Sequence, residues 1–196
     1  EFAFGLARIV AAWLHVGQTL DEEKVNGLQA QDEQEVAYQA AMRSLERRPH
    51  TTEEIRRKLE PKGFKPETVE FTLSRLRENG LIADGQFART WIENRATFRP
   101  RSHRALALEL RQKGIRDEDI QTALEESPAE DELARQAALR YARRLHGLDW
   151  QTFRQKLSGH LARRGFNYET VSQAVRQAWE SQETSGATTL IEDEED

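Results

Sequence analysis

Three glycines of the chain, Gly63, Gly114 and Gly165, lie 51 residues apart, and the residues around them repeat at the same spacing. A regular period of this length is typical of proteins built from repeated units that bury their apolar faces against one another. The sequence therefore predicts a tandem array of three small units. Seven further positions keep one chemical type, apolar, basic or acidic, in all three copies: Ile55, Leu106 and Leu157; Leu59, Leu110 and Leu161; Lys62, Lys113 and Arg164; Phe64, Ile115 and Phe166; Glu67, Glu118 and Glu169; Val69, Ile120 and Val171; Leu73, Leu124 and Val175.

Each unit has the pattern of a helix that ends at its glycine and is followed by a second helix. Apolar residues four apart precede a basic residue, and the glycine can adopt the left-handed conformation in which many helices end. Pro66 suits the first turn of the second helix in the first unit, and Asn167 can cap its equivalent in the third. Thr51 and Glu54 have the spacing of a capping box, and Ser102 occupies the position of Thr51 in the second unit.

A third helix is predicted in each unit by the apolar patterns at 36–45, 87–94 and 133–144. The fold class that follows is all-α, because strong helix formers dominate the sequence. We expect an elongated array of three tandem three-helix repeats, which occupy residues 33–83, 84–130 and 131–180.

The two ends of the chain differ from the repeats. Residues 1–32 form an amino-terminal segment, in which 1–6 suit a strand whose partner would lie upstream, and 8–15 and 21–28 suit short helices. Residues 181–196 hold six acidic residues and no basic one, and such a composition buries little apolar surface. We therefore expect residues 181–196 to form a disordered acidic tail.

Charge is unevenly distributed along the chain, whose formal net charge is −5. Residues 33–179 carry 27 lysines and arginines against 22 acidic residues, whereas both ends are acidic. Of the 29 basic residues, 23 are arginine, whose planar guanidinium group suits phosphate and carboxylate. The basic middle therefore favours an acidic or nucleic-acid partner, although a solvated, charged helical surface would have the same composition.

The sequence lacks the patterns that catalysis or cofactor binding would require. Glycine-rich phosphate loops, the nucleophile elbow and the HExxH zinc motif are absent, and the five histidines have no paired ligand spacing. We therefore expect a protein that is not an enzyme and that binds no metal or other cofactor. The longest apolar stretch, 6–16, is shorter than the roughly 20 residues of a membrane-spanning helix, and the absence of cysteine suits the reducing cytoplasm.

Arginines gather where the second unit joins its helices. Between residues 95 and 116, seven basic residues are opposed by Glu109 alone. Arg99 and Arg101 flank Pro100, which favours an extended connection from which both side chains can reach a phosphate or a carboxylate. The other interpretation, arginines that neutralise the carbonyl ends of helices, fits this pair less well.

Aromatic residues beside these arginines have two interpretations. Phe87, Trp91 and Phe98 could stack on the bases of a nucleic acid. Because Phe87 and Trp91 lie four residues apart on one helical face, packing in the core of the second unit is the interpretation that we favour.

Several strings of the sequence resemble the RecX family of recombination regulators. They are GLIADGQFARTWIENR from Gly80, ELRQKGI from Glu109 and LARRGF from Leu161. The segments RRPHTTEEIRRKLEPKGF, TFRPRSHRALALELRQKGI and RRGFNYETV also stand in the order typical of the family. Two departures are modest: Ala83 stands where an acid is common in the family, and Ser102 stands where glycine is common.

The resemblance implies a non-enzymatic regulator built from tandem three-helix repeats. Such a protein binds the RecA recombinase and its filament on single-stranded DNA, and it modulates filament extension, ATP hydrolysis and strand exchange in recombination, DNA repair and the SOS response. Inhibition is the expected direction, and assistance in some settings is the alternative that the resemblance leaves open. We also expect a weak direct contact with DNA, no membrane association and a monomeric state. The resemblance and the basic pattern together give these candidate contacts to RecA or DNA: Arg47, Arg48, Arg99, Arg101, Arg104, Arg163 and Arg164.

The alternative function is an autonomous DNA-binding module, whose helical repeats would read the groove of a duplex. No repeat gathers Asn, Gln and Arg on one helical face as the reading of bases requires, and the net charge is negative. A purely structural adaptor, the third possibility, would not need the strong preference for arginine.

Overall fold

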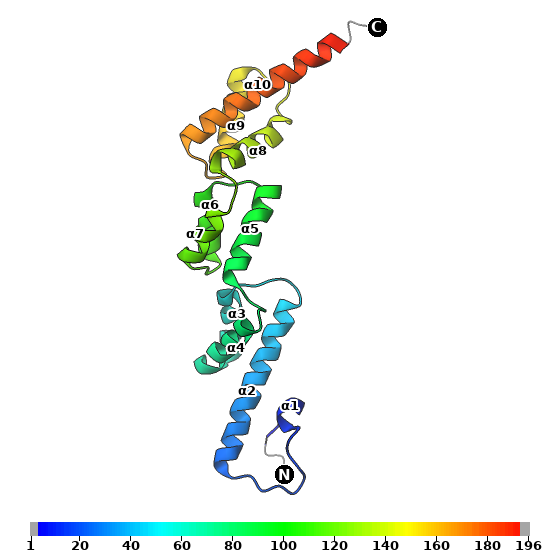
Figure 1. The fold of residues 1–196 in the computed structure, drawn as a ribbon, viewed down its shortest axis with the longest axis vertical. Coiled ribbons are helices and arrows are strands. Elements are labelled where there is room, and N and C mark those ends of the chain that lie inside the picture. Colours follow the sequence, from blue (N-terminus) through cyan, green and yellow to red (C-terminus); the bar gives the residue numbers. More distant parts are fainter. Residues whose placement is uncertain (1–3, 193–196) are drawn as a thin grey trace. The chain divides into compact units, whose positions relative to one another are not determined.

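The computed structural model describes the backbone of residues 4–192 and the side chains of residues 4–182. The chain divides into two compact units: unit 1 comprises Glu1–Phe87 with Lys113–Ile115, and unit 2 comprises Ala88–Gln112 with Arg116–Asp196. All regular structure in the described residues is helical (Figure 1), which confirms the all-α prediction. None of the helices in this part of the chain combines the length and the apolar character that a membrane span needs.

Unit 1 holds the first three-helix repeat. It consists of α2 (Glu22–Leu45), α3 (Thr52–Leu59) and α4 (Pro66–Glu78), with a short helix α1 (Arg8–Ala11) ahead of it and a 3-10 turn, η1 (Glu60–Lys62), after α3. Helix α2 packs along both α3 and α4 (Figure 1). The apolar faces predicted from the period point into this core, which is formed by Ala40, Ala41, Ile55, Leu59, Val69, Leu73, Leu76 and Ile82.

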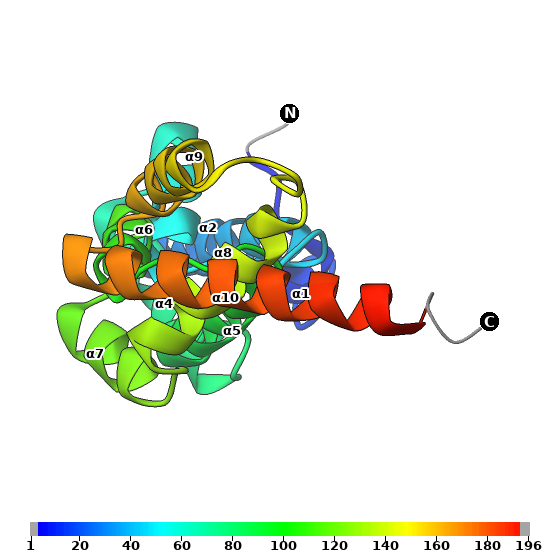
Figure 2. The same cartoon turned by 90° about the horizontal axis from the view of Figure 1, so that it is seen from above.

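Unit 2 holds the third repeat and most of the second. Helix α5 (Asp84–Phe98) begins in unit 1 and continues in unit 2, where α6 (His103–Gln112) and α7 (Asp117–Glu125) follow. The third repeat consists of α8 (Glu130–Ala142) and α9 (Trp150–Ala162), with α10 (Tyr168–Glu192) packed on both of them (Figure 2).

The core of unit 2 contains the residues that the period predicts to be apolar, except Leu124, which is half-buried. They are Leu106, Leu110, Ile120, Leu157, Leu161, Phe166, Val171 and Val175, all of which are buried. The equivalent residues Ile55, Leu59, Val69 and Leu73 are buried in unit 1, and Phe64 packs half-buried against that core. The period in the sequence therefore reflects one packing arrangement that is used three times.

The helix ends also agree with the sequence. The three periodic glycines adopt the left-handed conformation, with φ of 82° at Gly63, 79° at Gly114 and 93° at Gly165. The Thr51 and Glu54 side chains form the predicted capping box at the start of α3. The Asn167 side chain accepts a hydrogen bond from the Thr170 amide (2.9 Å) at the start of α10. These local signals were therefore predicted correctly.

The amino-terminal segment differs from the prediction. Of the strand predicted at 1–6, residues 1–3 lie outside the described residues. Residues 4–6 have no regular structure, since the described part of the chain contains no strand that could pair with them. The first helix ends at Ala11 because the chain turns there. The two helices predicted at 21–28 and 36–45 are one continuous helix, α2, because the residues between them are mostly good helix formers and give no stop signal.

The carboxy-terminal segment also differs. Helix α10 continues to Glu192, through much of the tail that was predicted to be disordered, while 193–196 lie outside the described residues. The Gln182 side chain donates a hydrogen bond to the Ala142 carbonyl oxygen (2.8 Å), which holds the helix to the end of α8. Extension of an existing helix avoids the cost of nucleation, so a polar sequence can continue it.

Candidate anion-binding interface

Arg164 lies at the joint between the second and third repeats within unit 2. Its half-buried side chain donates from Nη1 to the Pro100 carbonyl oxygen (2.8 Å) and from Nε to Nε2 of His160 (2.8 Å). Its own carbonyl oxygen accepts a hydrogen bond from the Ser102 amide (3.1 Å). A Cβ on the neighbouring Gly165 would lie 2.5 Å from Oγ of the buried Ser102. The turn after α9 therefore approaches the start of α6 as closely as a glycine allows.

Five other arginines surround this joint. Burial lowers the pKa of Arg164, and the charges of Arg101, Arg99 and Arg140 lower this pKa further. Burial also lowers the pKa of His160, to about 4, with contributions from the charges of Arg164, Arg163 and Arg144. Arg99, Arg101 and Arg140 thus lie near Arg164, and Arg144 and Arg163 lie near His160, which Arg164 contacts. We call these six arginines the arginine cluster: Arg99, Arg101, Arg140, Arg144, Arg163 and Arg164.

His160 is neutral within the arginine cluster. Its ring stacks on that of Tyr141, with the ring centroids 3.8 Å apart and 11° between the planes. With a pKa of about 4, the imidazole is uncharged at neutral pH, and its Nε2 can accept the hydrogen bond from Arg164. His160 therefore orients Arg164 without adding a positive charge.

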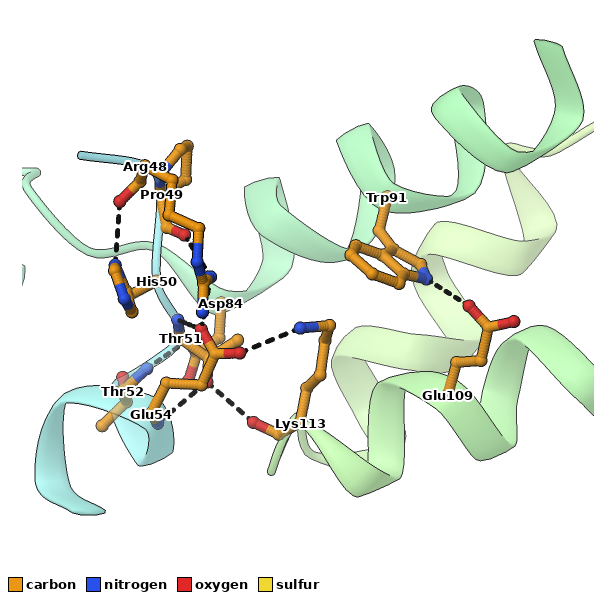
Figure 3. A network of polar contacts seen from close by, with 10 residues as sticks. All are labelled: Arg48, Pro49, His50, Thr51, Thr52, Glu54, Asp84, Trp91, Glu109 and Lys113. Atoms are coloured by element: carbon orange, nitrogen blue, oxygen red, sulfur yellow. Dashed lines mark hydrogen bonds and ion pairs between the residues drawn. The ribbon is translucent and has the colours of Figure 1, made fainter. Parts of the chain in front are cut away.

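Carboxylates compensate only part of this charge. Glu109 forms ion pairs with Arg101 (2.8 Å) and with Arg95 (2.9 Å), and it accepts a hydrogen bond from Nε1 of Trp91 (2.8 Å; Figure 3). The Arg140 side chain donates to a backbone carbonyl oxygen, that of Thr97 (2.6 Å). Three members of the arginine cluster are exposed and have no ion pair within the described part of the chain: Arg99, Arg144 and Arg163. Unpaired guanidinium groups of this kind suit a phosphate or carboxylate.

The structure brings together four of the seven predicted contact residues. Arg99, Arg101, Arg163 and Arg164 belong to the arginine cluster. Arg104 is exposed on α6, and no contact connects it with the cluster in the described residues. Arg47 and Arg48 lie in unit 1, where Arg47 is exposed.

Arg140 and Arg144 were missed as candidate contacts, although both stand in the basic run of the third repeat. Arg140 lies in the last turn of α8 and Arg144 lies just after this helix. Both belong to the run of basic residues at 140, 143 and 144, which spans the end of this helix. That concentration of positive charge at a helix end is the signal in the sequence that could have identified them.

Unit 1 contains the equivalent joint, one period earlier (Figure 3). The Thr51 hydroxyl donates to the Lys113 carbonyl oxygen (2.7 Å), and Nζ of Lys113 pairs with Oε1 of Glu54 (2.9 Å). The guanidinium of Arg48 pairs with the other carboxylate oxygen of Glu54 (2.9 Å) and donates to the Pro49 carbonyl oxygen. Arg48 and Lys113 therefore have structural partners, and this joint has less free positive charge than the arginine cluster.

The Glu54 carboxylate predicts a measurable pH dependence of stability. Its burial raises the pKa, but hydrogen bonds and charges from Arg48 and Lys113 outweigh burial and lower the pKa from 4.5 to about 2. A folded-state pKa below the unfolded value stabilises the fold above about pH 4.5, and this contribution disappears as the pH falls towards 2. We expect Glu54→Gln to lower the free energy of unfolding at pH 7 by about 1–3 kcal/mol, in urea titrations.

The difference between wild type and Glu54→Gln should shrink as the pH falls from 4.5 to 2. Glu132 is a matched control, because Arg135 and Gln136 lower its pKa to about 2 although its side chain is twice as exposed as that of Glu54, 38% against 19%. Glu132→Gln should have a much smaller effect, since solvent screens that pair. A difference for Glu54→Gln that stays constant across this pH range would show that its charge does not stabilise the joint.

The fold and the arginine cluster define the class of protein: an α-helical repeat protein with a cluster of exposed, unpaired arginines on its surface among the described residues. Models of the first, second and third three-helix domains of RecX match residues 37–76, 84–124 and 129–175. The chain therefore belongs to the RecX family of regulatory proteins.

Individual relatives agree with this assignment. Regulatory protein RecX of Streptomyces coelicolor is 35% identical over 168 residues, which cover 85% of this chain and 89% of the relative. Regulatory protein RecX of Prosthecochloris aestuarii is 39% identical over 128 residues, covering 65% and 83%. A crystal structure of regulatory protein RecX superposes with a TM-score of 0.73 at 28% identity and covers 89% of both chains. A crystal structure of RecX from Lactobacillus salivarius shares the fold, with a TM-score of 0.65 at 21% identity, and covers 75% of this chain and 97% of that one.

Proposed function

We propose that this protein is a non-enzymatic regulator of the RecA recombinase in the cytoplasm. It binds RecA and the RecA filament on single-stranded DNA, and it inhibits filament extension, ATP hydrolysis and strand exchange. The observation that carries the proposal is the arginine cluster, in which Arg99, Arg144 and Arg163 are exposed without an ion pair among the described residues. Membership of the RecX family supports RecA as the partner, because RecA regulation is the general role of that family.

The arginine cluster has the chemistry that such a partner requires. A nucleoprotein filament offers DNA phosphates and acidic protein side chains, and both accept hydrogen bonds from guanidinium groups. Arg99, Arg144 and Arg163 are the members that we expect to bind directly, because none of their side chains pairs with a described neighbour. Arg101 forms an ion pair with Glu109, and Arg164 donates hydrogen bonds to Pro100 and His160. These two arginines therefore support the surface and add to its positive electrostatic potential.

The remaining predicted residues have a secondary role in this proposal. Arg47 and Arg104 are exposed and can add further contacts to RecA or DNA. Arg48 is committed to Glu54 and Pro49, so we expect its replacement to affect the joint in unit 1 before it affects binding.

Titration of the protein into an ATP hydrolysis assay tests the proposal. RecA assembled on single-stranded DNA should lose most of its DNA-dependent hydrolysis as the protein approaches the RecA concentration, and the protein alone should hydrolyse no ATP. RecA without DNA supplies the background rate. Unchanged hydrolysis over the full titration, together with no binding to the filament, would refute the proposed function.

A further inference from the structure

A groove of 720 Å³ runs between helices α9 and α10 of unit 2. One face of each helix lines it: Trp150, Arg154 and Ser158 from α9, and Tyr168, Ser172 and Arg176 from α10. The span from Trp150 to Ser158 corresponds to about 12 Å at 1.5 Å per residue. The groove is thus a surface feature of the third repeat, separate from the contacts that hold Arg164.

Two aromatic side chains of this groove are exposed to solvent. Tyr168, the first residue of α10, is 87% exposed, and Trp150, the first residue of α9, is 38% exposed. Trp150 is held by edge contacts with Trp179 (centroids 5.4 Å apart), which fix the orientation of its ring. Tyr168 has no ring contact among the described residues, so a flat ligand could stack on it.

The charged residues of the groove are all positive within the described part of the chain. Arg154 and Arg176 are exposed, form no ion pair with a described residue, and are accompanied by polar side chains and not by acids in the lining. The floor is closed by Val171 and Val175, which are buried in the core. The groove therefore combines flat aromatic rings, free guanidinium groups and short polar side chains.

We infer that this groove binds single-stranded nucleic acid, with a base stacked on Tyr168 and neighbouring phosphates on Arg154 and Arg176. Alternation of aromatic and basic side chains along a groove is how proteins bind single strands without reading their sequence. An acidic helix of a partner protein would also match the charge. It would not need an exposed ring at the rim, however, and the buried floor leaves no apolar pocket for its side chains.

This inference deepens the proposed function, in which the protein acts where RecA is assembled on single-stranded DNA. It concerns a different surface from the arginine cluster and needs no RecA for its test. The proposed function would therefore survive if this groove did not bind nucleic acid.

Fluorescence anisotropy of the full chain with short labelled oligonucleotides tests the groove. A thymidine oligonucleotide and an abasic oligonucleotide with the same number of phosphates separate stacking from charge. We expect the thymidine strand to bind several-fold more tightly. Tyr168→Ala should weaken thymidine binding about tenfold and leave abasic binding unchanged, while Tyr168→Phe should bind like wild type. Arg154→Ala should weaken binding of both strands.

Phe71→Ala is the matched control, because Phe71 is an exposed aromatic (47%) on α4, outside the groove. It should change neither affinity, and thermal melting should show that every variant is folded. Equal binding of the thymidine and abasic strands, or full affinity of Tyr168→Ala for thymidine, would overturn the inference. So would binding of polyglutamate that Tyr168→Ala or Arg154→Ala weakens while thymidine binding is unaffected, since this result would assign the groove to an acidic protein.

Discussion

Replacement of Gly114 by alanine should lower the free energy of unfolding by about 3 kcal/mol, whereas Gly63→Ala should cost about 1 kcal/mol. Both glycines end a helix at nearly the same left-handed φ, 79° and 82°, so the backbone penalty is common to both. They differ in their surroundings. A Cβ on Gly114 would lie 2.3 Å from Cβ of Glu53, whereas a Cβ on Gly63 would meet nothing within 4 Å.

Denaturant titrations of the two variants measure this difference directly. Gly165→Ala should resemble Gly114→Ala, because its Cβ would lie 2.5 Å from Oγ of Ser102 and 2.9 Å from Cβ of Ala105. Gly63→Ala is the matched control for the conformational penalty. Equal losses at Gly63 and Gly114 would mean that the joint in unit 1 is looser than the structure indicates.

Combined replacement of Arg99 and Arg163 by alanine should weaken binding to the RecA filament about a hundredfold at low ionic strength. Each arginine can form a charge-assisted hydrogen bond worth about 1.5 kcal/mol, and two such losses correspond to about this factor. Added salt should reduce the difference, because exposed charges are screened. Filament binding across a salt series, followed by fluorescence anisotropy or sedimentation, is the measurement.

Arg43→Ala combined with Arg77→Ala is the matched control for this variant. Both arginines are exposed in unit 1, on α2 and α4, and their removal changes the net charge equally. Neither double variant should melt early, since exposed substitutions usually cost less than about 0.5 kcal/mol. If the control loses as much affinity as Arg99→Ala with Arg163→Ala, only the total charge matters and the arginine cluster has no specific role.

The parts of the fold that could be predicted from the sequence depend on local or periodic signals. The left-handed glycines, the capping box at Thr51 and the Asn167 cap each involve residues within one turn of a helix end. The cores follow from apolar positions that recur with one period. The continuity of α2 between 28 and 36 could also have been predicted, because that stretch holds good helix formers and no stop signal. The packing of α2 along α3 and α4, which helps to hold the helix, depends on residues distant in the sequence.

The candidate site could be predicted only in part. Arg99 and Arg101 were recognisable because they flank a proline, but the approach of Arg140 to them depends on how α8 packs. The ion pair between Lys113 and Glu54 joins residues 59 positions apart in the sequence, so no local pattern predicts it. The effect of Gly114→Ala on stability could likewise be predicted only in part. The left-handed helix end alone predicts a loss of about 1 kcal/mol, and the contact with Glu53, which only the structure shows, raises the expected loss.

Co-sedimentation with RecA tests the central claim most directly. The protein is centrifuged with RecA, single-stranded DNA and nucleotide, and in parallel with RecA alone and with DNA alone. The proposed function predicts saturable sedimentation with the filament, much weaker sedimentation with either component, and loss from the pellet for Arg99→Ala with Arg163→Ala. Wild-type protein that stays in the supernatant while the filament sediments, or that sediments equally with DNA alone, would contradict the claim.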